Sequence, residues 1–412
     1  DCLLSRGLGD VYKRQEVANA VAEIKNRIKE KSRPFLLECI TFRIRGHEEA
    51  SGTKYYPEGL VEEWSPKDPV IKFEKYLVDQ KVLTADECSK IKKDYTDLIT
   101  TDFEIANQEP IIESSKEKEI NDLFLSNDAK MIEPKGTNKE MRFIDAIADA
   151  LDIALDRNPE LVYMGQDIAD YGGVFKATDG LAAKYSKERV RNTPLCESAI
   201  VGAALGLSVK GQKAMVEMQF SDFVTCGFNQ IVNNLAKIHW RWGQNADVVV
   251  RMPTGANVGA GPFHSQSTES WFFHTPGLKI LYPSTPEDAK GLLLAAFQDP
   301  NPVMFFEHKY LYRSLSGEVP EGYYTTEIGK ARQVSAGNDV SIITYGLGVQ
   351  WAEHLAASNN NISFDVVDLR TLAPLDFDSI AQSVKRSGRV LIMHEDTSVS
   401  YTHLRAHETR GN

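Results

Sequence analysis

From residue 141 onward, helix-like and strand-like segments alternate along the chain at a spacing that few folds accommodate. The strand-like segments are short and almost wholly apolar, as expected for strands that are buried on both faces of a sheet. Such alternation predicts a parallel sheet with helices packed on both faces. The segments follow one another as IDAIADALDIAL, LVYMG, LAAKYS, VRNT, AIVGAALGLSV, AMVEMQF, VTCGFNQIVNNLAKI, DVVVRM, STPEDAKGLLLAAFQ and PVMFFEH.

Two local features refine this prediction. In STPEDAK, Ser284 is the expected N-cap, with Glu287 closing a capping box. After GEVPEGYY, a second α/β unit begins, with the segments DVSIITYG, GVQWAEHLAAS, ISFDVVDL, IAQSVKR and VLIMHED. Its GLGV sequence at 346–349 lacks the third glycine of a dinucleotide-binding loop, so we interpret it as a plain strand-to-helix turn.

Composition limits the classes of partner. The 412 residues predict two or three domains, and 47 basic against 58 acidic residues give a net charge of −11. This balance argues against nucleic acid or an anionic membrane as a partner, and no apolar run is long enough to span a bilayer. The five cysteines show neither CxxC pairing nor metal-site spacing, which favours free thiols in the cytoplasm: Cys2, Cys39, Cys88, Cys196 and Cys226.

The two ends do not continue the periodicity of their neighbours. DCLLSRGLGDVYKRQ at 1–15 and SVSYTHLRAHETRGN at 398–412 resemble translated adapter or assembly sequence. We therefore exclude both segments from the expected fold and expect the chain to be a fragment cut at both ends.

The stretch 193–266 carries the residues that we assign to chemistry. In TPLCE, Pro194 disfavours helix at the residue before it, while the next segment is helical in pattern, so Glu197 is predicted at a strand-to-helix junction. The local pattern alone favours a simpler interpretation, in which Glu197 is a first-turn carboxylate that faces the positive end of a helix. Cys196 beside it is more simply a buried residue than a nucleophile.

With MQFSDF and FHSQ following TPLCE in order, this stretch resembles the β part of the first, decarboxylating component of 2-oxo acid dehydrogenases, which are thiamine-diphosphate enzymes. The resemblance implies that Glu197 bonds the cofactor's aminopyrimidine and favours the imino tautomer that removes the thiazolium proton. It also implies that Phe223 stacks on the pyrimidine and that Leu195 and Gln219 line the cofactor. Without the resemblance, Phe223 is as well explained as a core aromatic residue.

His264 follows a glycine-rich run, RMPTGANVGAGPFHSQ. Glycine lets a backbone approach a ligand closely, so this composition favours a mobile, accessible histidine over a packed one. The resemblance implies an active-site proton donor, and a solvated loop histidine is the alternative.

The first hundred residues carry a second, weaker resemblance. After a helical pattern from Glu16, PFLLECITFRI predicts a buried strand that runs into the loop RGHEEASG. This resembles the C-terminal part of the α half of the same family, which implies that Arg43 and His47 contact the cofactor diphosphate. An exposed loop histidine is the alternative for His47. Glu48 replaces the family's regulatory serine, so no control by phosphorylation is expected there.

Two helical patterns follow in 66–100, separated by TADE, where Thr84 and Glu87 can form a capping box. They resemble the α-chain tail, which predicts a fused α/β chain. The expected fold is α/β, with doubly wound parallel sheets of the transketolase-like, thiamine-diphosphate-binding type after a helical tail, and a truncated second α/β domain. The predicted divisions are 16–125 for the α-type part, 126–138 for a linker, 139–330 for the pyrimidine-binding domain and 331–397 for the second domain.

The family's metal and diphosphate motif, GDG, does not occur in this sequence. Thus Mg²⁺ ligands are expected in a missing N-terminal part, and a homo-oligomer of fused chains is expected because the two halves of the cofactor site meet between subunits in this family. The resemblance further suggests a K⁺ ion held by backbone carbonyls at the turn of Asp299 and Asn301. The turn's ordinary role, helix termination, holds in either case.

The resemblance implies oxidative decarboxylation of a 2-oxo acid with acyl transfer to the lipoamide of a partner acyltransferase. TPLCE and EMQFSDF are most similar to the branched-chain, 2-oxoisovalerate type. Pyruvate is the alternative substrate, because an alkyl pocket discriminates by only about 1 to 3 kcal/mol and its lining is not legible in sequence. The sequence is also compatible with a transketolase-like transferase and with an inactive truncated fragment.

Overall fold

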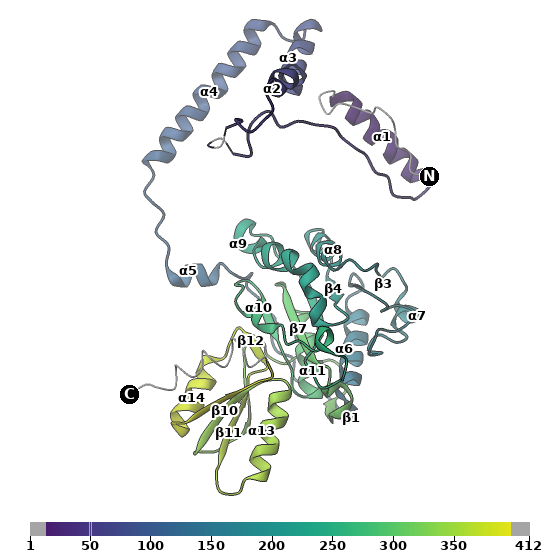
Figure 1. Cartoon of the computed structure of the whole chain (residues 1–412), viewed down its shortest axis with the longest axis vertical. Coiled ribbons are helices and arrows are strands. Elements are labelled where there is room, and N and C mark those ends of the chain that lie inside the picture. The colour runs from purple at the N-terminus through teal and green to yellow at the C-terminus, as the bar shows by residue number, and fades with distance from the viewer. Residues whose placement is uncertain (1–13, 49, 51, 397–412) are drawn as a thin grey trace. The chain divides into compact units, whose positions relative to one another are not determined.

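A computed structural model of the chain describes residues 14–48, 50 and 52–396 (Figure 1). It divides into two compact units, one up to Glu113 and one from Ser114 onward, which are described separately. Of the end segments expected to be foreign, 398–412 lies outside the described residues. So does 1–15, except for its last two residues, which begin helix α1 (Arg14–Glu30).

The first unit is helical. After α1 it contains α2 (Leu60–Trp64), a 3-10 turn (Ser65–Lys67), α3 (Pro69–Asp79) and α4 (Ala85–Gln108). The capping box predicted at the start of α4 is confirmed, since the Glu87 amide donates to the Thr84 hydroxyl at 3.2 Å. In return, the Thr84 amide donates to the Glu87 carboxylate at 2.7 Å.

The prediction that PFLLECITFRI forms a strand is wrong. Residues 34–43 run without regular secondary structure, and the described part of the first unit contains no strand with which they could pair. Leu36 and Ile40 are 80% and 61% exposed. An apolar segment becomes a strand only when a neighbouring strand satisfies its backbone N–H and C=O groups.

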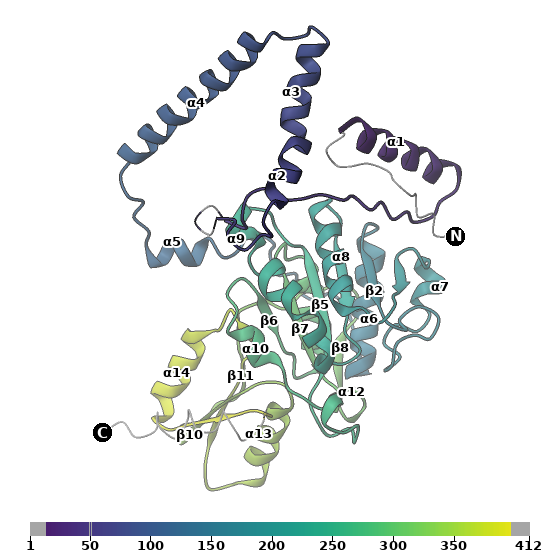
Figure 2. The ribbon, with the colours of Figure 1, turned by 45° about the horizontal axis from the view of Figure 1, so that its top comes forward.

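The predicted parallel sheet is confirmed in the second unit, where it has seven strands (Figure 2). Their order is β12-β6-β7-β5-β4-β2-β3, and all neighbours pair in parallel except β12 with β6. The strands are β2 (Val162–Gly165), β3 (Val190–Asn192), β4 (Ala214–Glu217), β5 (Val248–Thr254), β6 (Lys279–Leu281), β7 (Val303–His308) and β12 (Thr371–Ala373).

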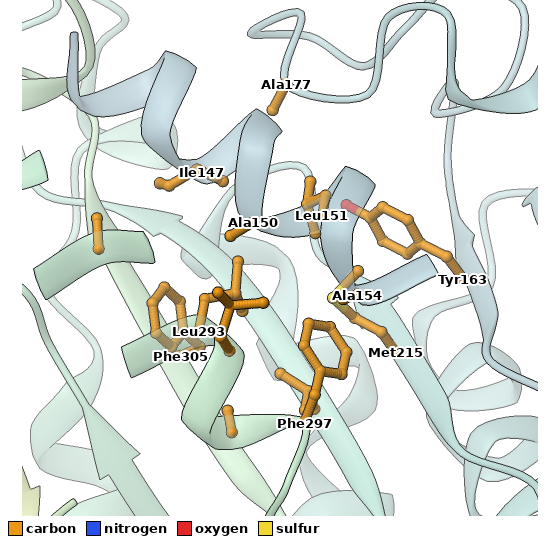
Figure 3. Close-up of a cluster of buried hydrophobic side chains, with 14 of the residues drawn as sticks. Ile147, Ala150, Leu151, Ala154, Tyr163, Ala177, Met215, Leu293, Phe297 and Phe305 are labelled. Carbon is orange, nitrogen blue, oxygen red and sulfur yellow. The ribbon is translucent and has the colours of Figure 1, made fainter. Parts of the chain in front are cut away.

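Helices cover both faces of this sheet, and alternate residues of β5 show why. Val249 belongs to the core cluster that α6 (Phe143–Arg157) and α11 (Pro286–Ala296) form on one face (Figure 3). Val248 and Val250 belong instead to a cluster with α8 (Glu197–Val209) on the other face. Short helices complete the layers: α7 (Leu181–Tyr185), α9 (Ile238–Trp242), α10 (Glu269–Phe273) and α12 (Leu311–Ser314).

The segment VTCGFNQIVNNLAKI is less regular than the other helical segments. It comprises a 3-10 stretch (Ser221–Gly227) and a π-helical stretch (Gln230–Leu235). Gly227 packs against the start of α8, where a Cβ atom would lie 3.4 Å from the carbonyl oxygen of Glu197. The chain after β4 therefore packs closely against the first residue of α8.

The second α/β unit of the sequence forms a four-stranded sheet of order β13-β10-β11-β9, with only β9 antiparallel. Helices α13 (Leu347–Ser358) and α14 (Phe377–Ser387) pack on it. β12 joins the larger sheet, a pairing that the sequence did not predict. The strands are β9 (Arg332–Ser335), β10 (Val340–Thr344), β11 (Phe364–Asp368) and β13 (Val390–Met393).

Three smaller features complete the second unit. Helix α5 (Lys116–Asn121) lies before the predicted linker, within the range assigned to the α-type part, and β1 (Asn138–Arg142) pairs antiparallel with β8 (Ser316–Pro320). The N-cap of α11 is Thr285, which accepts from the Asp288 amide at 3.1 Å, so the predicted cap at Ser284 is wrong. The Ser284 hydroxyl donates instead to Asp368 of β11.

No helix among the described residues has the length and apolar character needed to cross a membrane.

A buried cation lies at the centre of the main sheet. Arg251 of β5 is 1% exposed and donates to both carboxylate oxygens of Glu307 on β7, at 2.5 and 2.6 Å. It also donates to Glu217 of β4, and the hydroxyls of Tyr163 and Tyr312 complete the network. Burial opposes the charge of the guanidinium, but Glu307 and Glu217 hold the pKa of Arg251 well above its ordinary value. The network thus joins three adjacent parallel strands.

Replacing Arg251 by Met is expected to lower the free energy of unfolding by about 3 to 5 kcal/mol, because Glu217 and Glu307 would remain buried without a cation. Arg142→Met is the matched control, since Arg142 pairs with Asp145 on the exposed surface, and we expect little change for it. Urea denaturation of both variants measures the difference. Equal stability losses for the two variants would contradict the role of the network.

Candidate active site

Three of the predicted site residues, and one glutamine that the sequence did not single out, follow neighbouring strands at the same edge of the sheet. Gln166 follows β2, Glu197 follows β3, Phe223 follows β4 and His264 follows β5. These four strands are parallel and adjacent, so their carboxyl ends line one edge. In open α/β sheets this edge is where ligands bind.

Glu197 is the first residue of α8, at the strand-to-helix junction that the sequence predicted. Its half-buried carboxylate accepts a hydrogen bond from Gln166 Nε2 at 3.1 Å. The other polar atom of that amide, Gln166 Oε1, is buried without a hydrogen-bond partner among the described residues, and so is Thr193 Oγ1. Buried polar atoms are rarely left unpaired, so these two atoms mark a place where a polar ligand fits.

Phe223 and His264 are brought together by the fold. Their ring centroids lie 5.4 Å apart, and both rings also contact Phe220, at 5.7 Å from Phe223 and 4.7 Å from His264. All three contacts are edge to face, a favourable arrangement for aromatic rings. His264 therefore packs on an aromatic shelf while remaining partly accessible, so the expectation of an accessible rather than a packed histidine holds only in part.

Gln219 and Leu195 lie at the same edge but differ in their surroundings. Gln219 Nε2 donates to Asp167 Oδ2 at 2.9 Å, which fixes the side chain beside the residue that follows Gln166. Leu195 is 81% exposed.

Arg43 and His47 belong to the first unit, and both side chains are exposed there. The Tyr56 hydroxyl donates to the Arg43 carbonyl at 2.8 Å, and the His47 amide donates to the Tyr55 hydroxyl at 3.3 Å. Two tyrosines thus hold the backbone of this loop and leave both side chains accessible.

Asp299 and Asn301 precede β7, so they lie at the amino edge of the sheet, opposite the site described above. Their side chains anchor the linker: Asn301 exchanges hydrogen bonds with the backbone of Leu125 at 2.8 and 2.9 Å, and Asp299 accepts from Asn127 and Lys279. Across residues 14–48, 50 and 52–396, no group of three or more His, Cys, Asp or Glu side chains could hold a metal ion.

Comparison with known proteins agrees with this geometry. Residues 139–314 match the transketolase pyrimidine-binding domain, 329–400 the transketolase C-terminal domain and 14–115 the dehydrogenase E1 component. The chain is 45% identical over 270 residues to the mitochondrial 2-oxoisovalerate dehydrogenase subunit beta of Dictyostelium discoideum, covering 64% of this chain and 73% of that protein. It is 46% identical over 261 residues to the 2-oxoisovalerate dehydrogenase subunit beta of Bacillus subtilis (strain 168), covering 62% of this chain and 80% of that protein.

The chain belongs to the 2-oxo acid dehydrogenase E1 family. This confirms the resemblance inferred from sequence, including the fusion of an α-type segment to a β-type chain. The pyruvate dehydrogenase E1 component subunit beta of Bacillus subtilis (strain 168) is 43% identical over 262 residues, covering 62% of this chain and 80% of its own. Identities this similar do not separate branched-chain from pyruvate specificity.

The transketolase-like fold is also confirmed by a solved structure. A split-gene transketolase, described as an inactive beta4 tetramer, matches with a TM-score of 0.51 at 23% identity, covering 63% of this chain and 81% of that one. At that identity the likeness concerns the fold alone.

The E1 family implies thiamine diphosphate, and the residues at the carboxyl edge fit its aminopyrimidine. A planar heterocycle with donor and acceptor nitrogens needs an aromatic shelf, a carboxylate and a further polar contact. Phe223, Glu197 and the unpaired Gln166 Oε1 supply these three. Gln166 was not predicted from the sequence, because a single glutamine after an apolar strand has no distinguishing pattern.

Proposed function

We propose that this E1 chain provides the aminopyrimidine half of a thiamine-diphosphate site for the oxidative decarboxylation of a branched-chain 2-oxo acid. The observation that carries the proposal is the Glu197 carboxylate, fixed by Gln166 at the carboxyl edge of the sheet next to two unpaired buried polar atoms. A pyruvate dehydrogenase of the same class is the second candidate, since its B. subtilis relative is almost equally similar.

Glu197 is the proposed acid/base residue. Its carboxylate would share a proton with N1' of the aminopyrimidine, and the hydrogen bond from Gln166 Nε2 would hold it at the start of α8. When bound, thiamine diphosphate supplies the carbon nucleophile for the 2-oxo acid. Because the site lies partly buried, water competes weakly with this hydrogen bond.

The other residues have binding and proton-transfer roles in this proposal. Phe223 stacks on the pyrimidine, Gln219 and Leu195 border it, and His264 donates a proton to the bound substrate. Arg43 and His47 contact the diphosphate from the α-type segment, where their exposed side chains leave them accessible to a ligand.

Further components come from outside the described residues. Mg²⁺ and the diphosphate would be held by a GDG segment, which these 412 residues do not contain, and association of chains would bring the two halves of the site together. A lipoyl-bearing acyltransferase is the proposed acceptor of the acyl group.

K⁺ remains a proposal for the turn of Asp299 and Asn301, through their backbone carbonyls. The Asp299 and Asn301 side chains already bind the linker, so a cation there would stabilise the fold instead of taking part in catalysis. Exchange of K⁺ for Li⁺ is expected to lower the midpoint of a thermal melt of the protein. An unchanged midpoint would count against the ion.

The substrate is tested by assaying the assembled enzyme with 2-oxoisovalerate, pyruvate and a ketose phosphate, each with and without a lipoyl acceptor. We expect kcat/KM to favour the branched-chain acid over pyruvate by about 10-fold to 200-fold, the range that one or two extra methyl groups in an apolar pocket supply. Preference for pyruvate would establish the second candidate. Activity on the ketose phosphate alone would refute both.

Replacing Glu197 by Gln is expected to lower turnover at least ~100-fold while leaving the fold intact, because the amide cannot share the proton. Glu188→Gln is the control, since Glu188 is exposed and lies just before β3, at the amino edge of the sheet and opposite the proposed site. Circular dichroism checks folding, and the rate of 2-oxo acid decarboxylation measures the effect. Near-normal turnover of Glu197→Gln would remove Glu197 from the mechanism.

A further inference from the structure

The loop that carries His264 has a backbone that needs external restraint. Gly255, Gly259 and Gly261 all have positive φ, at +85°, +72° and +80°, a region in which glycine retains many alternative conformations. His264 can face a substrate only if both ends of this loop, residues 255–266, are held in place.

The far end of the loop is held by Asp222. Its Oδ1 atom accepts from the backbone amides of Ser265 and Gln266, each at 3.1 Å. The Gln266 carbonyl in turn accepts from the Gly255 amide at 3.1 Å, so the two ends of the loop lie side by side.

The near end is held by residues from distant parts of the sequence. Lys309, which is 3% exposed, donates from Nζ to the Gly255 carbonyl at 2.7 Å. Glu395, just after β13, accepts from the Ala256 amide at 3.3 Å and pairs with Nε2 of His308. The His308 ring packs so close to Gly255 that a Cβ atom there would lie 2.2 Å from Nε2, so only glycine fits.

We propose that Lys309 is a positioning residue for His264. Its ammonium group holds the Gly255 carbonyl and interacts electrostatically with Asp222 and Glu395, which bind the two ends of the loop. It also lies 5.5 Å from the centroid of Phe220, the ring against which His264 packs. This inference rests on the proposed catalytic role of His264 but concerns the loop, whose order can be measured without turnover.

The surroundings of Lys309 make this restraint dependent on pH. Burial lowers the pKa of Lys309 to about 8, against the opposing charges of Asp222 and Glu395. Burial alone would raise the pKa of Glu395, but His308, the Ala256 amide and Lys309 together lower it. Glu395 therefore stays ionised at neutral and alkaline pH. Above about pH 8 the neutral amine is a weaker donor, and the loop should loosen.

The contribution of Lys309 to the free energy of unfolding of the whole protein changes with pH in the opposite direction. Because the pKa of Lys309 is lower in the folded chain than in the unfolded chain, the unfolded chain binds more protons between about pH 8 and 10.4, and this group adds stability as pH rises. The Lys309 contribution to global stability therefore has the opposite pH dependence to the expected loosening of the loop.

The test is hydrogen–deuterium exchange of peptides from 255–266 in the full chain, from about pH 7.5, above the ordinary titration of imidazole, to about pH 9.5. In the wild-type protein we expect protection, corrected for intrinsic exchange, to fall about tenfold, the difference between a charge-assisted and a neutral hydrogen bond. Lys309→Met should show low protection across the range. Lys290→Met is the matched control, since buried Lys290 donates to a carbonyl on β8 at 2.7 Å, and it should follow the wild type.

In the assembled enzyme, Lys309→Met should lower kcat about 10-fold to 100-fold, as expected for a misplaced reacting group, and remove the alkaline limb of the kcat profile near pH 8. Constant protection of the wild-type loop across this pH range would overturn the proposal, and that measurement needs no variant. If the loop responds as expected but Glu197→Gln remains fully active, the restraint stands and the proposed function fails.

Discussion

The pairing of Arg251 with Glu217 and Glu307 is the interaction on which the active edge of the sheet depends. An unpaired charge at such depth would be strongly unfavourable, so the three side chains are stable there only together. Their strands, β5, β4 and β7, are those that lead directly into the His264 loop, the aromatic shelf and Lys309. The network therefore fixes the strand ends from which these groups extend.

Outside this network, the tightly packed sheet is distinct from the glycine-rich loop that follows β5. The sheet and its two helical layers are packed without exposed strands at the centre, whereas the loop after β5 is rich in glycine and is held by individual hydrogen bonds. Glu395 follows β13 of the four-stranded sheet, whereas the loop 255–266 follows β5 of the seven-stranded sheet. The order of this loop therefore depends on contact between the two sheets. Such a loop can adjust to a substrate at lower cost than a strand can.

Local patterns found the residues whose role depends on their own neighbours in sequence. Pro194 before a helical segment placed Glu197 at its junction, and the glycine run marked the loop of His264. The same approach failed where a partner was distant. PFLLECITFRI is apolar enough to form a strand, but no neighbouring strand lies beside it among the described residues. The cap of α11 is Thr285 instead of Ser284, because the Ser284 hydroxyl binds Asp368.

The sequence by itself determined the parallel α/β architecture, the family, the strand-to-helix junction of Glu197 and the glycine-rich loop of His264, because periodicity and short motifs are local. Only the tertiary structure decided that Gln166 supports Glu197, that β12 joins the larger sheet and that Lys309 and Glu395 hold one loop. These contacts join residues tens to more than a hundred positions apart, and their formation depends on strand order and register, which single-sequence periodicity does not specify.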